Sequence, residues 1–177
     1  MATGRTFVLI PGAGSDAWYW HRVEAELGGR GHQVVAVDLP WTDPAAGLPE
    51  YADAVVGAVA ERGPAGAGDL VLVAQSMGAY VAPLVCGRLP VSLLVLVNPM
   101  IPASGETAGQ WWANTGQPEA QREMDLRDGR RPDADFDPFV VFLHDVPQHI
   151  ADDSARHAAL MRLAGACSGG PRGWFGA

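Results

Sequence analysis

Two short motifs hold the residues whose types and spacing could support chemistry. The first is the segment 74–78 (AQSMG), which follows an apolar run. A strand that runs into small-x-Ser-x-Gly and then into a helix is typical of a nucleophile elbow, a sharp turn that presents a serine hydroxyl at the carboxyl edge of a sheet. The turn requires small residues two positions before and after the serine, and Ala74 and Gly78 are small. We therefore predict Ser76 as a nucleophile beside a helix N-terminus, which favours developing negative charge.

The second motif is Pro11-Gly12-Ala13-Gly14, directly after the first apolar run. An oxyanion hole needs two backbone N–H groups aimed at one point. One would come from Met77, the residue after the serine, and the other from Ala13, in the loop after a central strand. The alternative is an ordinary strand-to-helix junction with Ser76 as a helix cap. The presence of both motifs in this order favours the catalytic interpretation.

Apolar runs alternate with helical patterns along the first hundred residues. Unbroken apolar strands separated by helices indicate a parallel sheet with helices on both faces, so the predicted fold class is α/β. The predicted strands are residues 6–10, 34–37, 70–74 and 91–97. The predicted helices run from Ser15 or Asp16 to Gly28 or Gly29, from 51 to 62, and from the Ser76 turn to about Leu89, with Cys86 as a small core residue.

The composition excludes several classes of partner and cofactor. The chain has 177 residues, enough for one domain, and its net charge of −8 disfavours nucleic acid and anionic membranes as partners. All 12 basic residues are arginine, so a Schiff-base or P-loop lysine is excluded. No cluster of histidine, cysteine and carboxylate has the spacing of metal ligands. We therefore expect neither a metal nor a cofactor.

We expect a cytoplasmic protein that does not span a membrane. The longest apolar stretches are strand-sized, well short of the roughly 18 residues that cross a bilayer. The N-terminal apolar run 7–10 ends in Pro-Gly and is too short for a signal peptide. Cys86 and Cys167 make no disulfide framework.

The pattern changes after Asn98-Pro99. Residues 102–138 are polar and rich in glycine and proline, and Pro147 can open an amphipathic helix at its first turn. From residue 165 onward the sequence has no periodicity. We therefore predict a core at 1–101, a lid at 102–164 and an unstructured tail at 165–177.

Several of these segments together resemble a known family. Residues 7–20 (FVLIPGAGSDAWYW), the elbow AQSMG, and Asn98-Pro99-Met100 with Gly105-Glu106-Thr107 and Trp111-Trp112 resemble the α/β-hydrolase superfamily, in its branch of plant esterases, hydroxynitrile lyases and bacterial relatives. The resemblance covers about Thr6 to Leu163. It implies that the first strand lies between the second and third, with the fourth outside the third. It also implies a small-molecule substrate, an ester or similar carbonyl compound, and a partial helical lid with a pocket lined by Trp111, Trp112, Phe139 and Phe142.

The chain departs from this family's pattern after the lid. Relatives continue into two further strands whose loops carry an Asp and then a His, whereas only 14 residues follow Leu163 here and none is Asp, Glu or His. We therefore expect an α/β-hydrolase fold without its last two strands, and a serine hydrolase without its usual histidine and acid. An inactive, truncated pseudoenzyme is the alternative. Pro11 is a smaller departure, because many relatives carry His at that position.

Two further expectations follow from this departure. Among the five histidines, His144 is the strongest candidate for a replacement base because Asp145 adjoins it. The other histidines are expected at the surface or in packing contacts: His21, His32, His149 and His157. Strand 91–97 would have an uncovered apolar edge, which predicts pairing with a second copy as a homodimer, binding of another partner, or aggregation.

A dinucleotide-binding oxidoreductase is the main rival interpretation. Gly12-x-Gly14-x-x-Ala17 follows a strand and opens a helix, and Asp38 ends the next strand 24 residues after Gly14 (38 − 14). This arrangement satisfies the fingerprint for NAD(P), with Asp38 on a ribose hydroxyl. The bulky Trp18-Tyr19-Trp20 at the helix start argues against it. Asp38 would otherwise be a carboxylate that caps a loop, the interpretation we favour.

Overall fold

A computed structural model describes residues 4–62, 69–132 and 137–157. The contacts between residues divide them into two units, the first ending at Trp111 and the second beginning at Trp112. The predicted lid begins earlier, at residue 102, and its role stays a prediction. The predicted tail, 165–177, lies outside the described residues.

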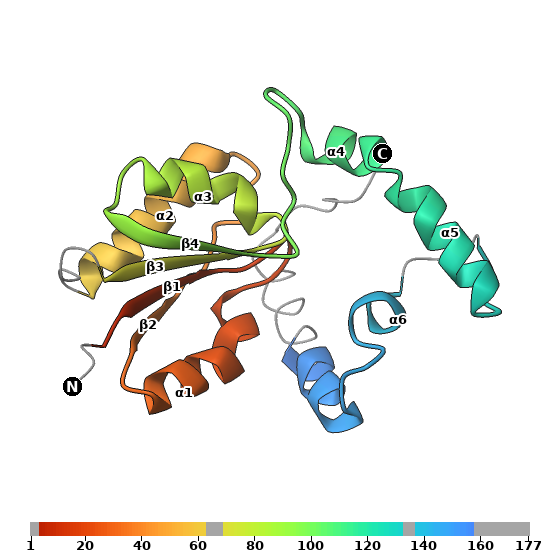
Figure 1. The fold of residues 1–177 in the computed structure, drawn as a ribbon, viewed down its shortest axis with the longest axis horizontal. Coiled ribbons are helices and arrows are strands. Elements are labelled where there is room, and N and C mark those ends of the chain that lie inside the picture. Colours follow the sequence, from red (N-terminus) through yellow and green to blue (C-terminus); the bar gives the residue numbers. More distant parts are fainter. Residues whose placement is uncertain (1–3, 63–68, 133–136, 158–177) are drawn as a thin grey trace. The chain divides into compact units, whose positions relative to one another are not determined.

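The first unit is built on a parallel sheet of four strands (Figure 1). The strands are β1 (Thr6–Ile10), β2 (Gln33–Ala36), β3 (Leu70–Gln75) and β4 (Val91–Val97). Their order across the sheet is β2-β1-β3-β4, and all pairs are parallel, as predicted. From β1 the chain continues to β2 on one side, and from β3 it continues to β4 on the other side, so a topological switch point lies between β1 and β3. In open α/β sheets, ligands bind at the carboxyl ends of strands that flank such a switch point.

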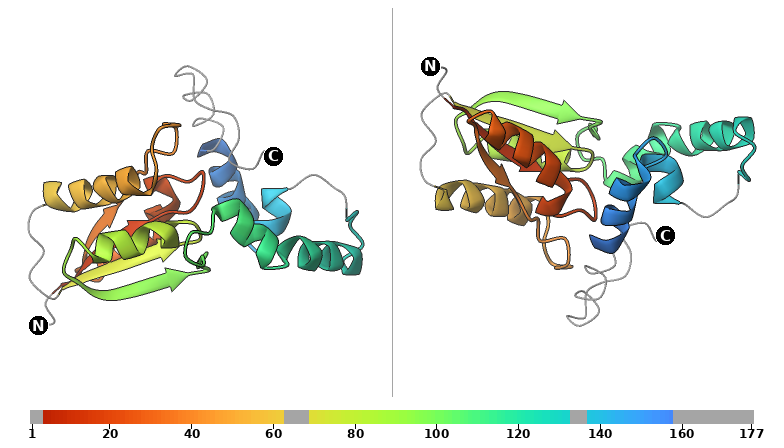
Figure 2. Two further views of the ribbon diagram at one scale, coloured as in Figure 1. Left: turned by 90° about the horizontal axis from the view of Figure 1, so that it is seen from above. Right: turned by 90° about the horizontal axis from the view of Figure 1, so that it is seen from below.

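Helices cover both faces of this sheet (Figure 2). The single turn η1 (Ala17–Trp20) and helix α1 (His21–Gly29) lie on one face, and α2 (Leu48–Glu61) and α3 (Gly78–Cys86) lie on the other. Local sequence explains where they begin. The side chain of Asp16 accepts a hydrogen bond from the Trp18 N–H at 3.1 Å, and Glu50 accepts one from the Gly47 N–H at 2.8 Å, so both helix starts are capped.

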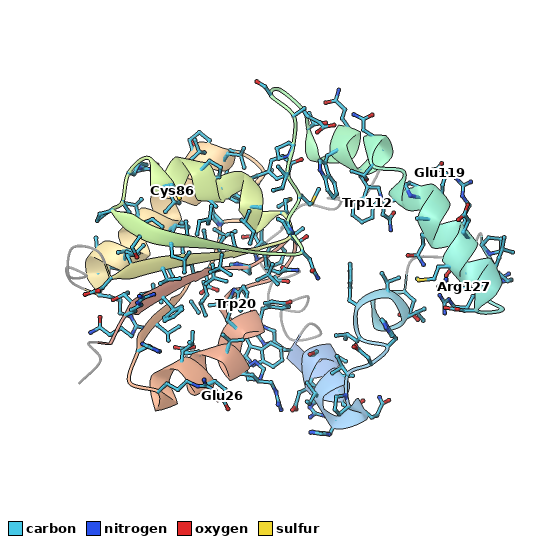
Figure 3. The ribbon with its side chains drawn as sticks, viewed as in Figure 1. Trp20, Glu26, Cys86, Trp112, Glu119 and Arg127 are labelled. Carbon is cyan, nitrogen blue, oxygen red and sulfur yellow. The ribbon has the colours of Figure 1, made fainter. Side chains whose placement is uncertain are left out.

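The core forms between the sheet and the helices. Strands β1 and β3 supply its centre, since Val8, Leu9, Ile10 and Leu72 are fully buried. On the α1 face, Trp20 is buried against the sheet (Figure 3) and joins a cluster with Leu9, Val34, Val71 and Val73. On the opposite face, the inner side of α2 is buried at the helical spacing of Tyr51, Val55 and Val59.

Strand β4 lies at one edge of the sheet and is far less covered. Among the described residues it pairs with β3 alone. Leu93 is 48% exposed, and Leu94 and Leu96 are each 38% exposed, in a strand without a charged residue. The predicted exposed apolar edge is therefore present in the described part of the chain, and the homodimer stays a prediction.

Helix α4 (Ala108–Asn114) spans the division between the units, and the second unit contains α5 (Gln117–Arg127), α6 (Pro138–Phe142) and a helix at 148–157. The predicted helix after Pro147 is confirmed. Helices α4 and α5 were not predicted, because α5 is polar on all sides and has no apolar stripe. The signal for α5 was local: Pro118 in its first turn and an Arg122–Glu119 ion pair one turn apart, 2.9 Å between nitrogen and oxygen.

Candidate active site

Ser76 occupies a strained turn between β3 and α3. Its φ is +50°, in the left-handed region that a residue with a side chain rarely adopts. Such a backbone costs of the order of 1–3 kcal/mol and persists only where the surrounding structure fixes it. Backbone strain of this kind at a serine that ends a central strand is a feature of functional sites.

The residues two positions before and after Ser76 are small because the surrounding chain packs closely against them. Ala74 is fully buried in the sheet. A Cβ atom added to Gly78 would lie 2.7 Å from the Pro11 carbonyl oxygen and 3.0 Å from the Ile10 side chain, closer than real contacts allow. The start of α3 therefore packs directly on the end of β1, and only glycine fits at position 78.

The loop after β1 lies against the serine. Gly12 is buried, and a Cβ added there would lie 3.1 Å from the Ser76 Cβ and 2.3 Å from the Gln75 Oε1. The two predicted motifs, more than sixty positions apart in the sequence, therefore meet at the switch point. The absence of a side chain at Gly12 is what allows this approach.

The predicted oxyanion residues both lie at this junction. Ala13 follows Gly12 and is half-buried, and Met77 follows Ser76 and is buried. Helix α3 begins immediately after the serine, since the Ala79 N–H donates to the Ser76 carbonyl at 3.1 Å and the Tyr80 N–H donates to the Met77 carbonyl at 3.0 Å. Ser76 thus lies at a helix N-terminus, where backbone dipoles favour an anion.

A third segment, after β4, holds the backbone of Ser76. The Ser76 N–H donates to the Val97 carbonyl at 3.0 Å, and the Ser76 carbonyl accepts from the Met100 N–H at 3.1 Å. Asn98 lies between these two partners and also has a left-handed backbone, with a φ of +44°. Sequence reasoning did not assign Asn98 a role, although Asn before Pro is a turn signal and Asn tolerates this conformation.

Tyr80 of α3 has a raised pKa, and Glu106 contributes to this rise. The hydroxyl of Tyr80 is buried, and this burial raises the pKa of Tyr80, with a further rise from the negative charge of Glu106. The Glu106 carboxylate also accepts a hydrogen bond from the Ala103 N–H at 2.8 Å, which orders the segment after β4. Tyr80 is therefore neutral at physiological pH.

The two histidines of the first unit have structural roles, as predicted. His21 stacks on Trp18, with ring centroids 4.3 Å apart, and its Nδ1 lies 2.8 Å from the Trp18 carbonyl oxygen. His32 accepts a hydrogen bond from the Arg5 N–H at 3.1 Å, at the amino edge of the sheet opposite Ser76. His144 belongs to the second unit, where it is exposed and lines a hollow beside Met124, Asp128, Arg130 and Val140.

The rival dinucleotide interpretation does not fit the structure. Asp38 Oδ1 accepts a hydrogen bond from the Ala17 N–H at 2.7 Å, which confirms its loop-capping role. The α-helix begins only at His21, after the separate turn η1, so the glycine loop does not open onto an α-helix N-terminus. In the dinucleotide-binding fold, β1 lies between β2 and β4, whereas here it lies between β2 and β3.

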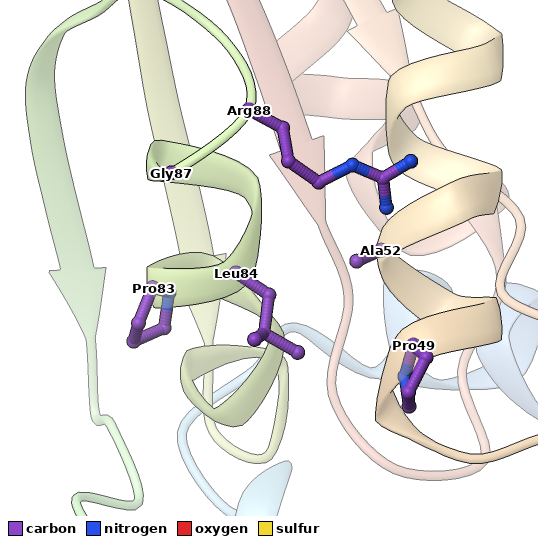
Figure 4. A pocket seen from close by; sticks show the side chains of 6 residues that line it. All are labelled: Pro49, Ala52, Pro83, Leu84, Gly87 and Arg88. Atoms are coloured by element: carbon purple, nitrogen blue, oxygen red, sulfur yellow. The ribbon is translucent and has the colours of Figure 1, made fainter.

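In the described part of the chain, neither the other surface hollow nor any group of metal-binding side chain types offers a competing site. A shallow groove of about 340 Å³ lies between α2 and α3 (Figure 4), lined by Pro49, Ala52, Pro83, Leu84, Gly87 and Arg88. Its one charged residue, Arg88, forms an ion pair with Asp53, 2.7 Å between nitrogen and oxygen. No described group of three or more His, Cys, Asp or Glu side chains could hold a metal, and no described helix is long and apolar enough to cross a membrane.

Comparison with known proteins decides the family. The model of the Alpha/beta hydrolase family matches residues 7–176, which include both motifs. The chain belongs to the α/β-hydrolase family. The sequence resemblance is therefore confirmed.

Curated relatives of this α/β-hydrolase are plant esterases. It is 34% identical over 115 residues to "Probable esterase PIR7A" of Oryza sativa, an alignment that covers 60% of this chain and 43% of the rice protein. It is 32% identical over 107 residues to "Methylesterase 7" of Arabidopsis thaliana, covering 55% of this chain and 41% of that protein. This α/β-hydrolase therefore spans less than half the length of these curated relatives.

Solved structures share the fold. Polyneuridine aldehyde esterase matches with a TM-score of 0.53 at 24% identity, over 64% of this chain and 48% of that chain. Tomato methylketone synthase I, solved with 2-tridecanone, matches with a TM-score of 0.51 at 22% identity, over 65% of this chain and 47% of that chain. At these identities the similarity concerns the fold of this α/β-hydrolase.

Proposed function

We propose that this chain carries the nucleophile and the oxyanion site of a carboxylic-ester hydrolase. The observation that supports it most is the left-handed Ser76 at the end of β3, with the Gly12 loop of the neighbouring strand packed against it. The esterases among its relatives support the same class of substrate, a small ester or a similar carbonyl compound.

In this proposal Ser76 Oγ attacks the carbonyl carbon of the ester. The carbonyl π electrons move to oxygen, and the resulting oxyanion accepts hydrogen bonds from the Ala13 and Met77 N–H groups. The tetrahedral species then expels the alcohol and leaves an acyl group on Ser76, which water hydrolyses to release the acid. The hydroxyl proton of Ser76 passes to a base and then to the leaving alcohol.

The rate depends on that base. His21 and His32 are engaged in structural contacts, so neither is proposed for this role. His144 stays the strongest candidate of the described histidines by sequence, because Asp145 adjoins it. Without a base, a serine hydroxyl is a weak nucleophile at neutral pH. We therefore propose slow ester hydrolysis at Ser76 by this 177-residue chain.

A fluorophosphonate probe tests the proposal directly, because Ser76 Oγ would displace fluoride and form a stable phosphonyl serine. We expect one added probe mass on the wild-type chain, mapped to Ser76, and none on Ser76→Ala. Ser104→Ala, which removes an exposed serine after β4, should label like the wild type. Equal p-nitrophenyl acetate hydrolysis by wild type and Ser76→Ala, together with no labelling, would overturn the proposal.

A further inference from the structure

We propose that Asn98 is a positioning residue, which holds the nucleophile Ser76 in its strained conformation by shaping the turn after β4. This inference rests on the proposed role of Ser76. It concerns a residue that acts on Ser76 through the backbone. Three observations on the described chain carry it.

The first observation is the pair of left-handed residues. Among the described residues, Ser76 and Asn98 are the ones other than glycine with positive φ, at +50° and +44°. They end neighbouring strands at matching positions, since Gln75 pairs with Val97 in the last step of the β3–β4 ladder. The register of this ladder shifts between Leu70 and Val71 and is regular from Val71 to Gln75. Two strained residues side by side at the end of that regular stretch indicate one coupled structure.

The second observation is the hydrogen bonding between the two turns. Both polar backbone groups of Ser76 bond to residues that flank Asn98: its N–H to the Val97 carbonyl at 3.0 Å, and its carbonyl to the Met100 N–H at 3.1 Å. Val97 and Met100 can both bond to Ser76 because the chain bends at Asn98. If residue 98 adopted an extended backbone instead, it would turn at least one of these groups away from Ser76.

The third observation is the identity and exposure of residue 98. Asn visits the left-handed region more readily than other residues with a side chain, and the following Pro99 disfavours the right-handed helical region. The Asn98 side chain is exposed, so the core does not require it. Its backbone conformation, rather than its packing, is therefore what the site uses.

Two substitutions at Asn98 separate the effect of its backbone conformation from the effect of losing its side chain. Asn98→Gly keeps access to the left-handed region, whereas Asn98→Val has a β-branched side chain for which positive φ is a severe strain. Ser104→Val, an exposed position in the same segment, controls for the addition of a valine to this loop. Far-UV circular dichroism and thermal unfolding identify the variants that remain folded, and Asn98→Ala replaces Asn98→Val if the latter does not fold.

Labelling by a fluorophosphonate gives the functional readout. A misplacement of about 1 Å can cost about 100-fold in rate, so we expect Asn98→Val to label Ser76 about 10- to 100-fold more slowly than wild type. Asn98→Gly should stay within about 3-fold of the wild type, a difference below 1 kcal/mol. In p-nitrophenyl acetate hydrolysis, the loss should fall on kcat and leave KM unchanged, at a folded fraction that circular dichroism shows to equal that of the wild type.

Amide hydrogen exchange measured by NMR gives a readout that does not depend on activity. In Asn98→Val the Ser76 and Met100 amides should exchange about 10-fold faster or more, a change of about 1.4 kcal/mol, while in Asn98→Gly and Ser104→Val they should stay protected. If the wild type is labelled and Asn98→Val and Asn98→Gly are labelled at equal rates, this inference is overturned while the proposed function stands. No labelling of the wild type would overturn the proposed function instead, and unchanged exchange in Asn98→Val would show that Asn98 does not maintain the two hydrogen bonds.

Discussion

Strands β3 and β4 are neighbours of similar composition and very different burial. Both are parallel, almost entirely apolar and end at a left-handed residue. Five of the six residues of β3 are buried, whereas no residue of β4 is, and Leu93, Leu94 and Leu96 are each more than a third exposed. Burial therefore follows position in the sheet and not apolar content. The predicted nucleophile lies at the end of the strand that its surroundings fix most firmly.

The position of β3 also explains how the site is formed. Strands on both sides bring their following loops to its carboxyl end, the Gly12 loop from β1 and the Asn98 turn from β4. Strand β4 has a described neighbour on one side only and supplies backbone contacts from that side. A central strand thus receives support from two loops, and this support maintains the strain at Ser76.

The largest expected effect compares two leucines in register. Leu72 of β3 pairs with Leu94 of β4, and the first is fully buried while the second is 38% exposed. Leu72→Ala should lower the free energy of unfolding by about 2–5 kcal/mol, because it leaves a cavity in the core. Leu94→Ala should lower it by about 1 kcal/mol. Urea unfolding of both variants measures the difference, and equal losses would contradict the contrast between the strands.

A second comparison uses two glycines in helices. An alanine Cβ at position 78 would lie 2.7 Å from the Pro11 carbonyl oxygen, whereas at Gly57 of α2 it would meet nothing within 4 Å. Gly78→Ala should therefore destabilise the fold by about 1–3 kcal/mol. Gly57→Ala should stabilise it by about 0.5–1 kcal/mol. Thermal and urea unfolding check both signs, and a neutral Gly78→Ala would argue against close packing of α3 on β1.

The exposed edge of β4 supports the predicted homodimer, which sedimentation velocity can test. A charge at Leu93, the most exposed residue of the strand, should weaken self-association by at least about 10-fold, or 1.4 kcal/mol. Leu126→Lys is the matched control, because Leu126 is 63% exposed and belongs to α5, not to β4. A wild-type chain that stays monomeric at all concentrations would exclude this dimer.

The smallest effect concerns the tyrosines of the first unit. Burial raises the pKa of Tyr19, Tyr51 and Tyr80 above the ordinary value of 10.0. Above pH 10 the unfolded chain loses these protons first and the folded chain retains them, so stability should fall as pH rises further. Absorbance at 295 nm should show tyrosinate forming at higher pH in the folded protein than in urea. A smaller pH dependence in Tyr80→Phe would assign part of the effect to Tyr80.

Sequence alone predicted the strands and the two motifs, because each has a local signal, whereas the order of the strands was implied by the family resemblance. Apolar runs mark the strands, and the small residues around Ser76 reflect contacts that the structure makes at Gly78 and Gly12. Two predictions about the helix after Ser76 were wrong, one on where it ends and one on the burial of Cys86. Helix α3 ends at Cys86 rather than near Leu89, because Gly87 follows, and Cys86 is half-buried rather than a core residue.

The remaining features depend on contacts that no local pattern encodes. The exposure of Leu94 depends on which strands flank β4, and the role of Asn98 depends on the register that places it opposite Ser76. Helix α5 lacks an apolar stripe, so periodicity could not indicate it. The capping of a loop by Asp38, in contrast, was anticipated, because a carboxylate after a strand commonly caps a nearby loop, and the structure supplies the Ala17 N–H as its partner.

The most direct test of the account is whether Ser76 is a reactive nucleophile. Intact-mass analysis after incubation with a fluorophosphonate should find one adduct on the wild-type chain, with peptide mapping placing it on Ser76. Ser76→Ala should remain unlabelled under the same conditions, while Ser104→Ala should label like the wild type. An unmodified wild-type chain, or an adduct that persists in Ser76→Ala, would contradict the assignment of Ser76 as the nucleophile.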